Sequence, residues 1–233
     1  MKNKNLPSPD KNGIIRILLP IDYTDSNKQL LKKFNINPVI YDFFQENIVR
    51  PNTHKADSKK HYEILRSELE RIKDKQILDI GCGTGSIIKY LDTNNYYTGL
   101  DISYSLLKKA AKRIESSCLK QAKLIEGSAE ELPFKDSSFD FCICNTALHM
   151  IPDYKRSIQE ITRVLKVEGY LIGCCPATGI NKQFDEKWGK VIQKRKMIHS
   201  LNEENIKTAC IQSDLKYKRI ATNGGLLYFR ADK

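Results

Sequence analysis

The chain has 233 residues, of which 40% are hydrophobic and 29% are charged, as in an ordinary globular protein with one main core. No apolar run is long enough to cross a membrane, and the lysine-rich start lacks the apolar segment of a secretory signal. We therefore expect a cytoplasmic protein. Seven cysteines without a C-x-x-C pair and four scattered histidines favour free buried thiols and predict no metal site.

The net charge of +11 is unevenly distributed along the chain. Residues 1–75 hold 15 Lys and Arg against 10 Asp and Glu, residues 76–175 hold 12 against 12, and residues 176–233 hold 12 against 6. Two basic flanks therefore enclose a neutral centre. Such flanks attract an anionic small molecule or a nucleic acid, unless they are simply a solvated surface.

The first 60 residues predict an N-terminal arm or cap that is partly flexible, ahead of a main domain over 61–233. The polar start (1–13) indicates a loose segment, and the apolar run 14–21 predicts a short strand or a packed arm. Residues 37–49 predict a short amphipathic helix, 50–60 a loop, and 61–72 a helix with apolar residues at helical spacing.

From residue 76 the chain alternates between strands and helices, which predicts an α/β fold with a parallel sheet and right-handed crossovers. The predicted strands are 76–80, 96–102, 122–128, 139–146 and 169–175, and the predicted helices are 84–91, 103–117 and 154–166. Residues 176–200 predict an insertion on the substrate side that contains a helix over 181–198. A further helix is predicted over 202–213. Strands 215–220 and 226–231 would form a terminal hairpin, which makes one strand antiparallel.

The stretch "ILDIGCGTG" (77–85) places Gly81, Gly83 and Gly85 directly after the first of these strands. A strand, a glycine turn and a helix start expose backbone N–H groups and allow a ligand to approach closely, at the edge where parallel sheets bind ligands. A dinucleotide and S-adenosylmethionine both use this geometry. The spacing here is G-x-G-x-G, with Ser86 where the dinucleotide fingerprint has its last small residue.

Two acids help to choose between these ligands. Asp101 follows the turn by about twenty residues, where a carboxylate can accept both ribose hydroxyls of either ligand; a purely structural acid is the alternative. Asp79 lies inside the apolar strand and needs a partner. A pyrophosphate would repel it, whereas an ammonium group or the amides of the turn would satisfy it, so Asp79 favours S-adenosylmethionine.

These motifs, with "GLDIS" (99–103) and the segments 126–153 and 159–172, resemble class I S-adenosylmethionine-dependent methyltransferases. The similarity is greatest to the broad small-molecule branch that includes ubiquinone- and menaquinone-biosynthesis methyltransferases. It covers residues 61–175 well and the terminal hairpin loosely. The resemblance implies a Rossmann-like seven-stranded, mostly parallel sheet of order 3-2-1-4-5-7-6, with one antiparallel strand and helices on both faces.

The resemblance also implies a set of residues that bind the cofactor S-adenosylmethionine and its product S-adenosylhomocysteine. Many relatives have Asp where Ser128 stands, and some fold a Tyr over the cofactor, as Tyr41 would unless it merely packs in its helix. The implied contacts are Gly81, Gly83, Gly85, Asp79 and the backbone of Asn145 around the methionine part, Asp101 on the ribose, and Ile102, Ser128 and Ala129 on the adenine.

His149 follows the fourth strand of the alternating region and is the candidate general base, unless it is a packed or capping histidine. His54, His61 and Trp188 could line the acceptor site or belong to the core. The sequence thus predicts methyl transfer to a small-molecule acceptor, which the basic flanks would favour as an anion. The sequence names neither that acceptor nor an oligomeric state.

Three alternatives stay open at this point. An RNA methyltransferase would use the basic flanks, although "NTALHM" (145–150) lacks the Asn/Asp-Pro-Pro-aromatic and Pro-Cys motifs of base-modifying enzymes. An NAD-dependent oxidoreductase would need the dinucleotide interpretation of the turn. A protein that binds the cofactor without turnover would have no acceptor site.

Overall fold

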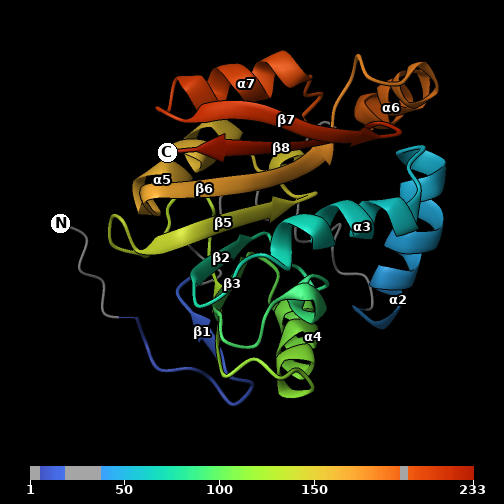
Figure 1. Cartoon of the computed structure of the whole chain (residues 1–233). Helices are drawn as coiled ribbons and strands as arrows, with labels where there is room; N and C mark the ends of the chain where they lie inside the picture. The colour runs from blue at the N-terminus through green and yellow to red at the C-terminus, as the bar shows by residue number, and fades with distance from the viewer. Residues whose placement is uncertain (1–5, 19–37, 195–198) are drawn as a thin grey trace.

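The computed structural model describes residues 6–18, 38–194 and 199–233, and within these the chain forms one eight-stranded sheet of order β1-β4-β3-β2-β5-β6-β8-β7 (Figure 1). Seven of these strands have the predicted order 3-2-1-4-5-7-6, and β8 is antiparallel to both its neighbours. The strands are β1 (Ile14–Arg16), β2 (Gln76–Ile80), β3 (Tyr96–Asp101), β4 (Gln121–Glu126), β5 (Phe139–Asn145), β6 (Leu165–Pro176), β7 (Lys216–Asn223) and β8 (Leu226–Asp232).

The eighth strand, β1, is an addition to the predicted sheet. It pairs in parallel with β4 at the sheet edge, with Ile14 opposite Leu124. Ile14 and Ile15 are both buried, so the apolar run that begins at residue 14 serves to extend the sheet. The part of this run from residue 19 on lies outside the described residues.

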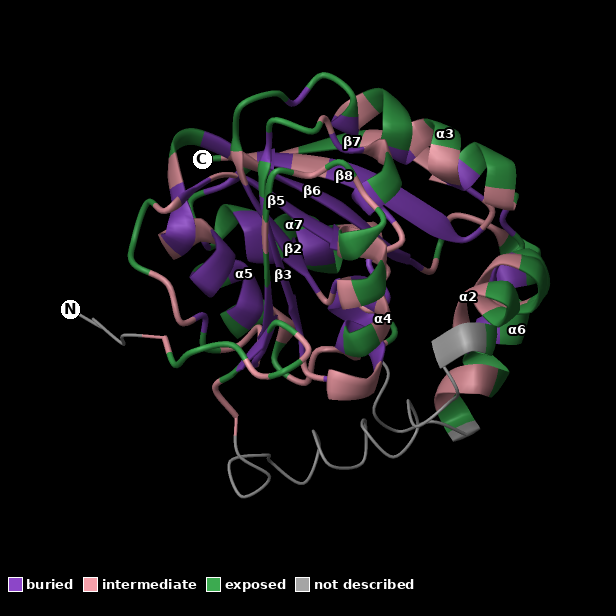
Figure 2. Ribbon diagram, turned by 90° about the horizontal axis from the view of Figure 1, so that it is seen from below, coloured by how far each residue is buried: buried purple, intermediate pink, exposed green. Residues whose placement is uncertain are grey.

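Helices cover both faces of the sheet (Figures 1 and 2). Leu78 and Ile80 of β2 pack with helices α5 (Tyr154–Val164) and α7 (Glu203–Ile211). Ile77, one position away, packs with α3 (Ser58–Leu69) and α4 (Tyr104–Glu115), as the alternation of side chains along a strand requires. The helices are α2 (Pro38–Phe44), the π-helix η2 (Gln45–Thr53), α3 (Ser58–Leu69), η3 (Ile88–Tyr90), α4 (Tyr104–Glu115), η4 (Leu148–Met150), α5 (Tyr154–Val164), α6 (Lys182–Lys194) and α7 (Glu203–Ile211).

The predicted helix over 84–91 is wrong, because only the short 3-10 helix η3 forms there after a series of turns. Gly83 and Gly85 both adopt positive φ, which an α-helix does not accommodate. The carbonyl of Thr84 accepts a hydrogen bond from Arg113 of α4 at 2.9 Å instead of a helical amide. The predicted loop 50–60 is also partly wrong, since η2 continues to Thr53.

The N-terminal elements are fastened to the turn of the β7–β8 hairpin, at the carboxyl edge of the sheet. The amide of Gly225 donates to the carbonyl of His54 at 2.7 Å. Asn223 accepts from the amide of Asp57 at 3.0 Å and donates to its carbonyl at 2.7 Å. Residues 38–57 therefore lie over the carboxyl edge of the sheet, where the glycine turn also lies.

The described part of the chain has no helix that is both long and apolar enough to span a membrane. All seven cysteines are free, and Cys118 alone of them is exposed, so the thiols of β5 and β6 act as small core residues.

Candidate functional site

Two adjoining cavities open at the carboxyl edge of the sheet. The larger cavity has a volume of about 740 Å³, counting the open space at its mouth, and is lined by the ends of β3, β4 and β5. The smaller cavity, of about 540 Å³ on the same basis, is lined by the glycine turn and helix η2. Because they share part of their lining, one elongated ligand could occupy both. The shared residues are Tyr41, Gly81, Gly83, Asn145 and Thr146.

The three glycines of the turn divide into two groups. Gly81 and Gly83 line both cavities, and Gly83 has no atom nearer than 4.0 Å to the position a Cβ would take, so its surface is open to a ligand. Gly85 lines neither cavity: a Cβ there would come within 2.5 Å of Ile88 and 3.3 Å of Ala110. Gly85 therefore lets helix α4 pack closely on the turn.

Asp101 ends β3, lies buried, and lines the larger cavity. Its two carboxylate oxygens accept hydrogen bonds from the amides of Gly83 at 2.8 Å and Ser103 at 2.7 Å. Burial raises the pKa of Asp101 to about 6, although its hydrogen bonds from backbone amides oppose the shift. Asp101 is thus both a wall of the cavity and a brace for the turn. Ile102 follows it and lines the same cavity.

Asp79 lies buried in β2 and lines the smaller cavity. The sequence suggested an ammonium group or the amides of the turn as its partner, but the hydroxyl of Tyr97 donates to it at 2.8 Å. Burial raises the pKa of Asp79 to about 7, against the effect of this hydrogen bond. A carboxylate that ionises near neutrality therefore stands in the wall of the smaller cavity.

Helix α2 is tied to the glycine turn by Asp42. One oxygen of Asp42 accepts from the hydroxyl of Thr84 at 2.6 Å, and the other accepts from Lys109 at 2.6 Å and Arg113 at 2.7 Å. This attachment places the neighbouring Tyr41 where it lines both cavities. Burial and the charge of Asp101 raise the pKa of Tyr41, so its hydroxyl stays protonated.

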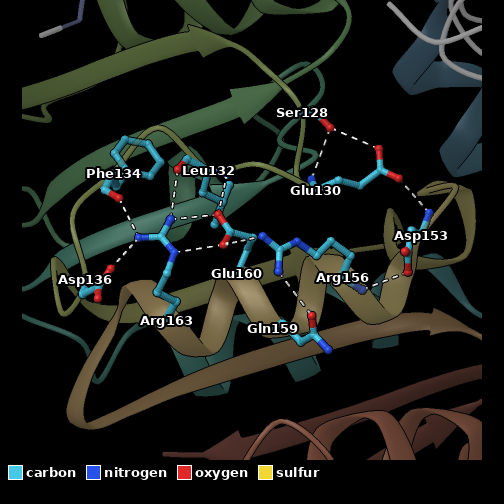
Figure 3. Close-up of polar contacts among 10 residues, drawn as sticks. All are labelled: Ser128, Glu130, Leu132, Phe134, Asp136, Asp153, Arg156, Gln159, Glu160 and Arg163. Atoms are coloured by element: carbon cyan, nitrogen blue, oxygen red, sulfur yellow. Dashed lines mark hydrogen bonds and ion pairs between the residues drawn. The ribbon is translucent and has the colours of Figure 1, made fainter. Parts of the chain in front are cut away.

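Ser128, Ala129 and Glu130 all line the rim of the larger cavity. Glu130, which the sequence did not predict as a site residue, lies beside Ser128 (Figure 3). The hydroxyl of Ser128 donates to one oxygen of Glu130 at 3.1 Å, and the other oxygen accepts from the amide of Asp153 at 2.8 Å. The carboxylate at this rim therefore comes from the second residue after Ser128. The run "SAEE" (128–131), in which two acids follow Ser128 and Ala129, could have indicated a carboxylate at this rim.

An ion-pair network on α5 holds the segment that carries this rim (Figure 3). Buried Glu160 accepts from the amide of Leu132 at 2.8 Å. Arg163 donates to Glu160 at 2.8 Å and to the carbonyls of Leu132 and Phe134 at 3.0 and 2.8 Å. Because the network satisfies backbone groups directly, it fixes the path of residues 128–136.

The end of β5 brings two further groups to the cavities. Asn145 lines both cavities, and its buried side-chain oxygen has no hydrogen-bond partner. Thr146 adopts a φ of 55° while its amide donates to the carbonyl of Cys174 at 2.7 Å. Strained backbone of this kind concentrates at functional sites, and here it turns the chain along the cavity wall.

His149 lies apart from these cavities, although the next residue, Met150, lines the larger one. Its ring packs 5.8 Å from that of Trp188, and its Nδ1 atom is buried without a hydrogen-bond partner. Burial lowers the pKa of His149 to about 3, with smaller contributions from two other histidines. The imidazole is therefore neutral at ordinary pH, and its catalytic role stays a prediction.

The other candidate aromatic residues belong to packed clusters. His54 lies with its ring centroid 5.7 Å from that of Trp188, which also stacks on Phe184. His61 is buried in α3 and its Nδ1 atom lies 2.7 Å from the Tyr228 hydroxyl. In the described parts of the chain, no three His, Cys, Asp or Glu residues are grouped so that they could hold a metal ion.

Arg50 was not singled out by the sequence, because it lies in a segment predicted to be a loop. It belongs to the π-helix η2, is 6% exposed, and lines the smaller cavity. Only the fold places it within the site.

Comparisons with known proteins agree with this geometry. Residues 78–173 match a family model described as a methyltransferase domain. A demethylmenaquinone methyltransferase from Bacillus cereus is 34% identical over 121 residues, which cover 48% of this chain and 51% of the relative. A second one, from Listeria welshimeri, is 36% identical over 103 residues, which cover 42% and 44%. The chain thus spans about half the length of these curated relatives.

Solved structures show the same fold at low sequence identity. The YcgJ protein of Bacillus subtilis superimposes with a TM-score of 0.65 at 16% identity, covering 75% of this chain and 98% of that protein. Phosphoethanolamine N-methyltransferase 2 of Haemonchus contortus gives 0.69 at 16% identity, covering 91% and 60%. The matched segment carries the glycine turn, the acid after β3 and the end of β5, and it is similar to a methyltransferase domain. The described chain has the Rossmann-like fold of solved methyltransferases.

Proposed function

We propose that this chain binds S-adenosylmethionine across the two cavities and transfers its methyl group to a small-molecule acceptor. The observation that carries the proposal is the hydrogen bond from the amide of Gly83 to the Asp101 carboxylate, at 2.8 Å, on the wall of the larger cavity. There a sugar diol can meet a carboxylate while the open glycine surface admits the ligand. The adenosine would occupy the larger cavity and the amino acid end the smaller one.

When bound, S-adenosylmethionine supplies an electrophilic methyl group on a sulfonium ion. The chain itself contributes position: the shared residues Gly81, Gly83 and Tyr41 would hold the middle of the ligand between the cavities. Such alignment of a nucleophile is worth about 7–11 kcal/mol in well-oriented systems. A general base is required only for an acceptor that must lose a proton.

The small-molecule acceptor is supported by the curated relatives, whose names describe methylation of demethylmenaquinone. Met150, Ile151 and Pro152 give the larger cavity an apolar wall, which suits a partly apolar acceptor. The basic flanks would favour one that is also anionic. The RNA alternative stays a prediction, whereas the match of residues 78–173 to a methyltransferase domain argues against the dinucleotide interpretation of the turn.

The proposal is tested by following S-adenosylhomocysteine formation with fractionated metabolites and, separately, with total RNA. We expect turnover with a small-molecule fraction. Turnover with RNA alone would favour the second function, and calorimetric binding of S-adenosylhomocysteine without any turnover would favour a protein that only binds the cofactor. Binding of NAD in place of S-adenosylhomocysteine would contradict the proposal altogether.

A further inference from the structure

We propose that one face of the protein, made by helices α2, η2 and α4, binds to the surface of an anionic lipid bilayer. Two features of this face carry the inference: a stripe of exposed apolar side chains on α2 and η2, and a groove lined with lysines on α4. The apolar side chains would enter the bilayer, and the lysines would contact lipid headgroups. The binding itself does not depend on the proposed function, because it requires neither cofactor nor acceptor.

The apolar stripe consists of Ile40, Phe43, Phe44 and Ile48. Seven large hydrophobic side chains are exposed in residues 6–18, 38–194 and 199–233, and these four lie close together in the sequence. Phe43 is 64% exposed and Ile40 is 55% exposed. Spacings of three and four residues place side chains on one side of a helix. Single exposed hydrophobic residues are ordinary, whereas a contiguous exposed group marks a binding surface.

The opposite side of the same helices faces the candidate site. Tyr41 lines both cavities and Gln45 lines the smaller one, while Asp42 ties α2 to the glycine turn. No residue of the stripe lines either cavity, so a ligand bound there would leave the stripe exposed. A further partner is needed to cover it.

The lysine-lined groove runs along α4, beside α2 (Figure 2). Its charged lining residues are Lys11, Lys108, Lys109, Lys112 and Glu115. Lys109 pairs with Asp42 of α2 at 2.6 Å. In the part of the chain that the structure describes, no carboxylate forms an ion pair with the other three lysines. Because Phe43 follows Asp42 in α2, the cationic groove and the apolar stripe adjoin.

An anionic bilayer is the partner that matches both features. Helices that bind at a bilayer surface insert their apolar side while neighbouring cationic side chains contact the headgroups, and each lysine near an anionic surface adds to the affinity. A nucleic acid would match the lysines but leave the stripe in water. A second copy that met this face across a two-fold axis would bring two lysine grooves together, and their charges would repel.

Binding in this way would set the mouth of the site close to the bilayer, since Tyr41 lies next to Ile40 in α2 and lines both cavities. A partly apolar acceptor could then reach the larger cavity from the lipid phase. This consequence, unlike the binding, rests on the proposed function.

The test measures co-sedimentation of the full chain with vesicles of phosphatidylcholine and phosphatidylglycerol in equal parts. We expect binding that weakens as salt is added. Phe43→Ser with Ile48→Ser should weaken it about tenfold or more, because two apolar side chains no longer leave water. Lys108→Gln with Lys112→Gln should also weaken it about tenfold and reduce its dependence on salt. Vesicles of phosphatidylcholine alone should bind wild type more weakly.

Two matched variants serve as controls. Val167→Ser with Ile211→Ser removes two exposed apolar side chains that lie outside the stripe. Lys216→Gln with Lys218→Gln removes two exposed lysines from β7, at the opposite edge of the sheet from β1. Both should bind the anionic vesicles as wild type does, and thermal unfolding checks that every variant is folded.

Four results would overturn the inference. They are no binding of wild type to the anionic vesicles, equal losses in the control variants, retention of RNA but not of vesicles, and a wild-type dimer in light scattering that the stripe variant converts to a monomer. In the last case a second copy would cover the stripe. Failure to bind S-adenosylhomocysteine would instead concern the proposed function alone, because vesicle binding is measured without any ligand.

Discussion

The two cavities of the site are built from different parts of the chain. The larger cavity is walled mainly by the ends of β3, β4 and β5, all within the segment that matches the methyltransferase family. The smaller cavity takes Gln45, Arg50 and Tyr62 from the region before that segment. Under the proposed function, the adenosine would therefore be bound by residues of the matched segment, whereas binding of the amino acid end would also depend on residues that precede that segment.

The same division separates what could be predicted from what could not. The glycine turn, Asp101 and the strand order follow from short-range patterns, since a glycine at positive φ and an acid at a strand end are local features. Arg50 depends on contacts such as that between Asp57 and Asn223, which are 166 positions apart. The predicted helix over 84–91 is wrong for a local and a distant reason: Gly85 adopts a positive φ, and Arg113 of α4, 29 positions from Thr84, donates to the Thr84 carbonyl.

The largest loss of ligand affinity is expected for Asp101→Ala, which alters the larger cavity. We expect roughly a hundredfold loss of affinity for both S-adenosylhomocysteine and 5′-methylthioadenosine, because the carboxylate would serve the part that they share. The amides of Gly83 and Ser103 also lose their acceptor, at about 1–3 kcal/mol each if they stay buried. Calorimetry and chemical denaturation measure the two effects.

Glu204→Ala is a suitable control, because Glu204 is an exposed acid of α7 that pairs with Lys207 and lines neither cavity. It should change neither affinity. If Asp101→Ala lost only stability and kept both affinities, Asp101 would be a structural acid, and the assignment of the adenosine to the larger cavity would be wrong.

Asp42→Ala tests the attachment of helix α2 to the glycine turn and to helix α4. Removing the acceptor shared by Thr84, Lys109 and Arg113 should loosen α2 and with it Tyr41, which lines both cavities. We expect both ligands to bind about tenfold more weakly, mainly through faster dissociation in stopped-flow measurements, since a single charge-assisted contact contributes about 1.5–3 kcal/mol. Unchanged dissociation rates would show that α2 does not cover the site.

The pH dependence should distinguish the two carboxylates. An ammonium-bearing ligand favours ionised Asp79, whose pKa burial raises to about 7. Affinity for S-adenosylhomocysteine should therefore rise about three- to tenfold from pH 5.5 to 7.5. The affinity for 5′-methylthioadenosine should reach its maximum at a lower pH, because it depends only on Asp101, whose pKa is about 6. Asp79→Asn should remove the difference between the two profiles.

The free protein should respond to pH in the opposite direction. The folded state holds the protons of Asp79 and Asp101 more tightly than the unfolded chain does. Their contribution to the free energy of unfolding is thus largest near pH 4 and is lost as the pH rises to about 7. Denaturation of wild type and Asp79→Asn over this range measures it, and parallel profiles for the two would contradict the raised pKa.

The smallest effect is expected at His149. A base whose conjugate acid has a pKa of about 3 is a weak proton acceptor at neutral pH, and the ring packs on Trp188 outside both cavities. His149→Phe keeps an aromatic ring there and removes the buried Nδ1 atom, which has no hydrogen-bond partner. We therefore expect affinity and turnover within about twofold of wild type. A large fall in turnover at unchanged affinity would instead mean that the acceptor reaches this imidazole, and would restore the catalytic role predicted from the sequence.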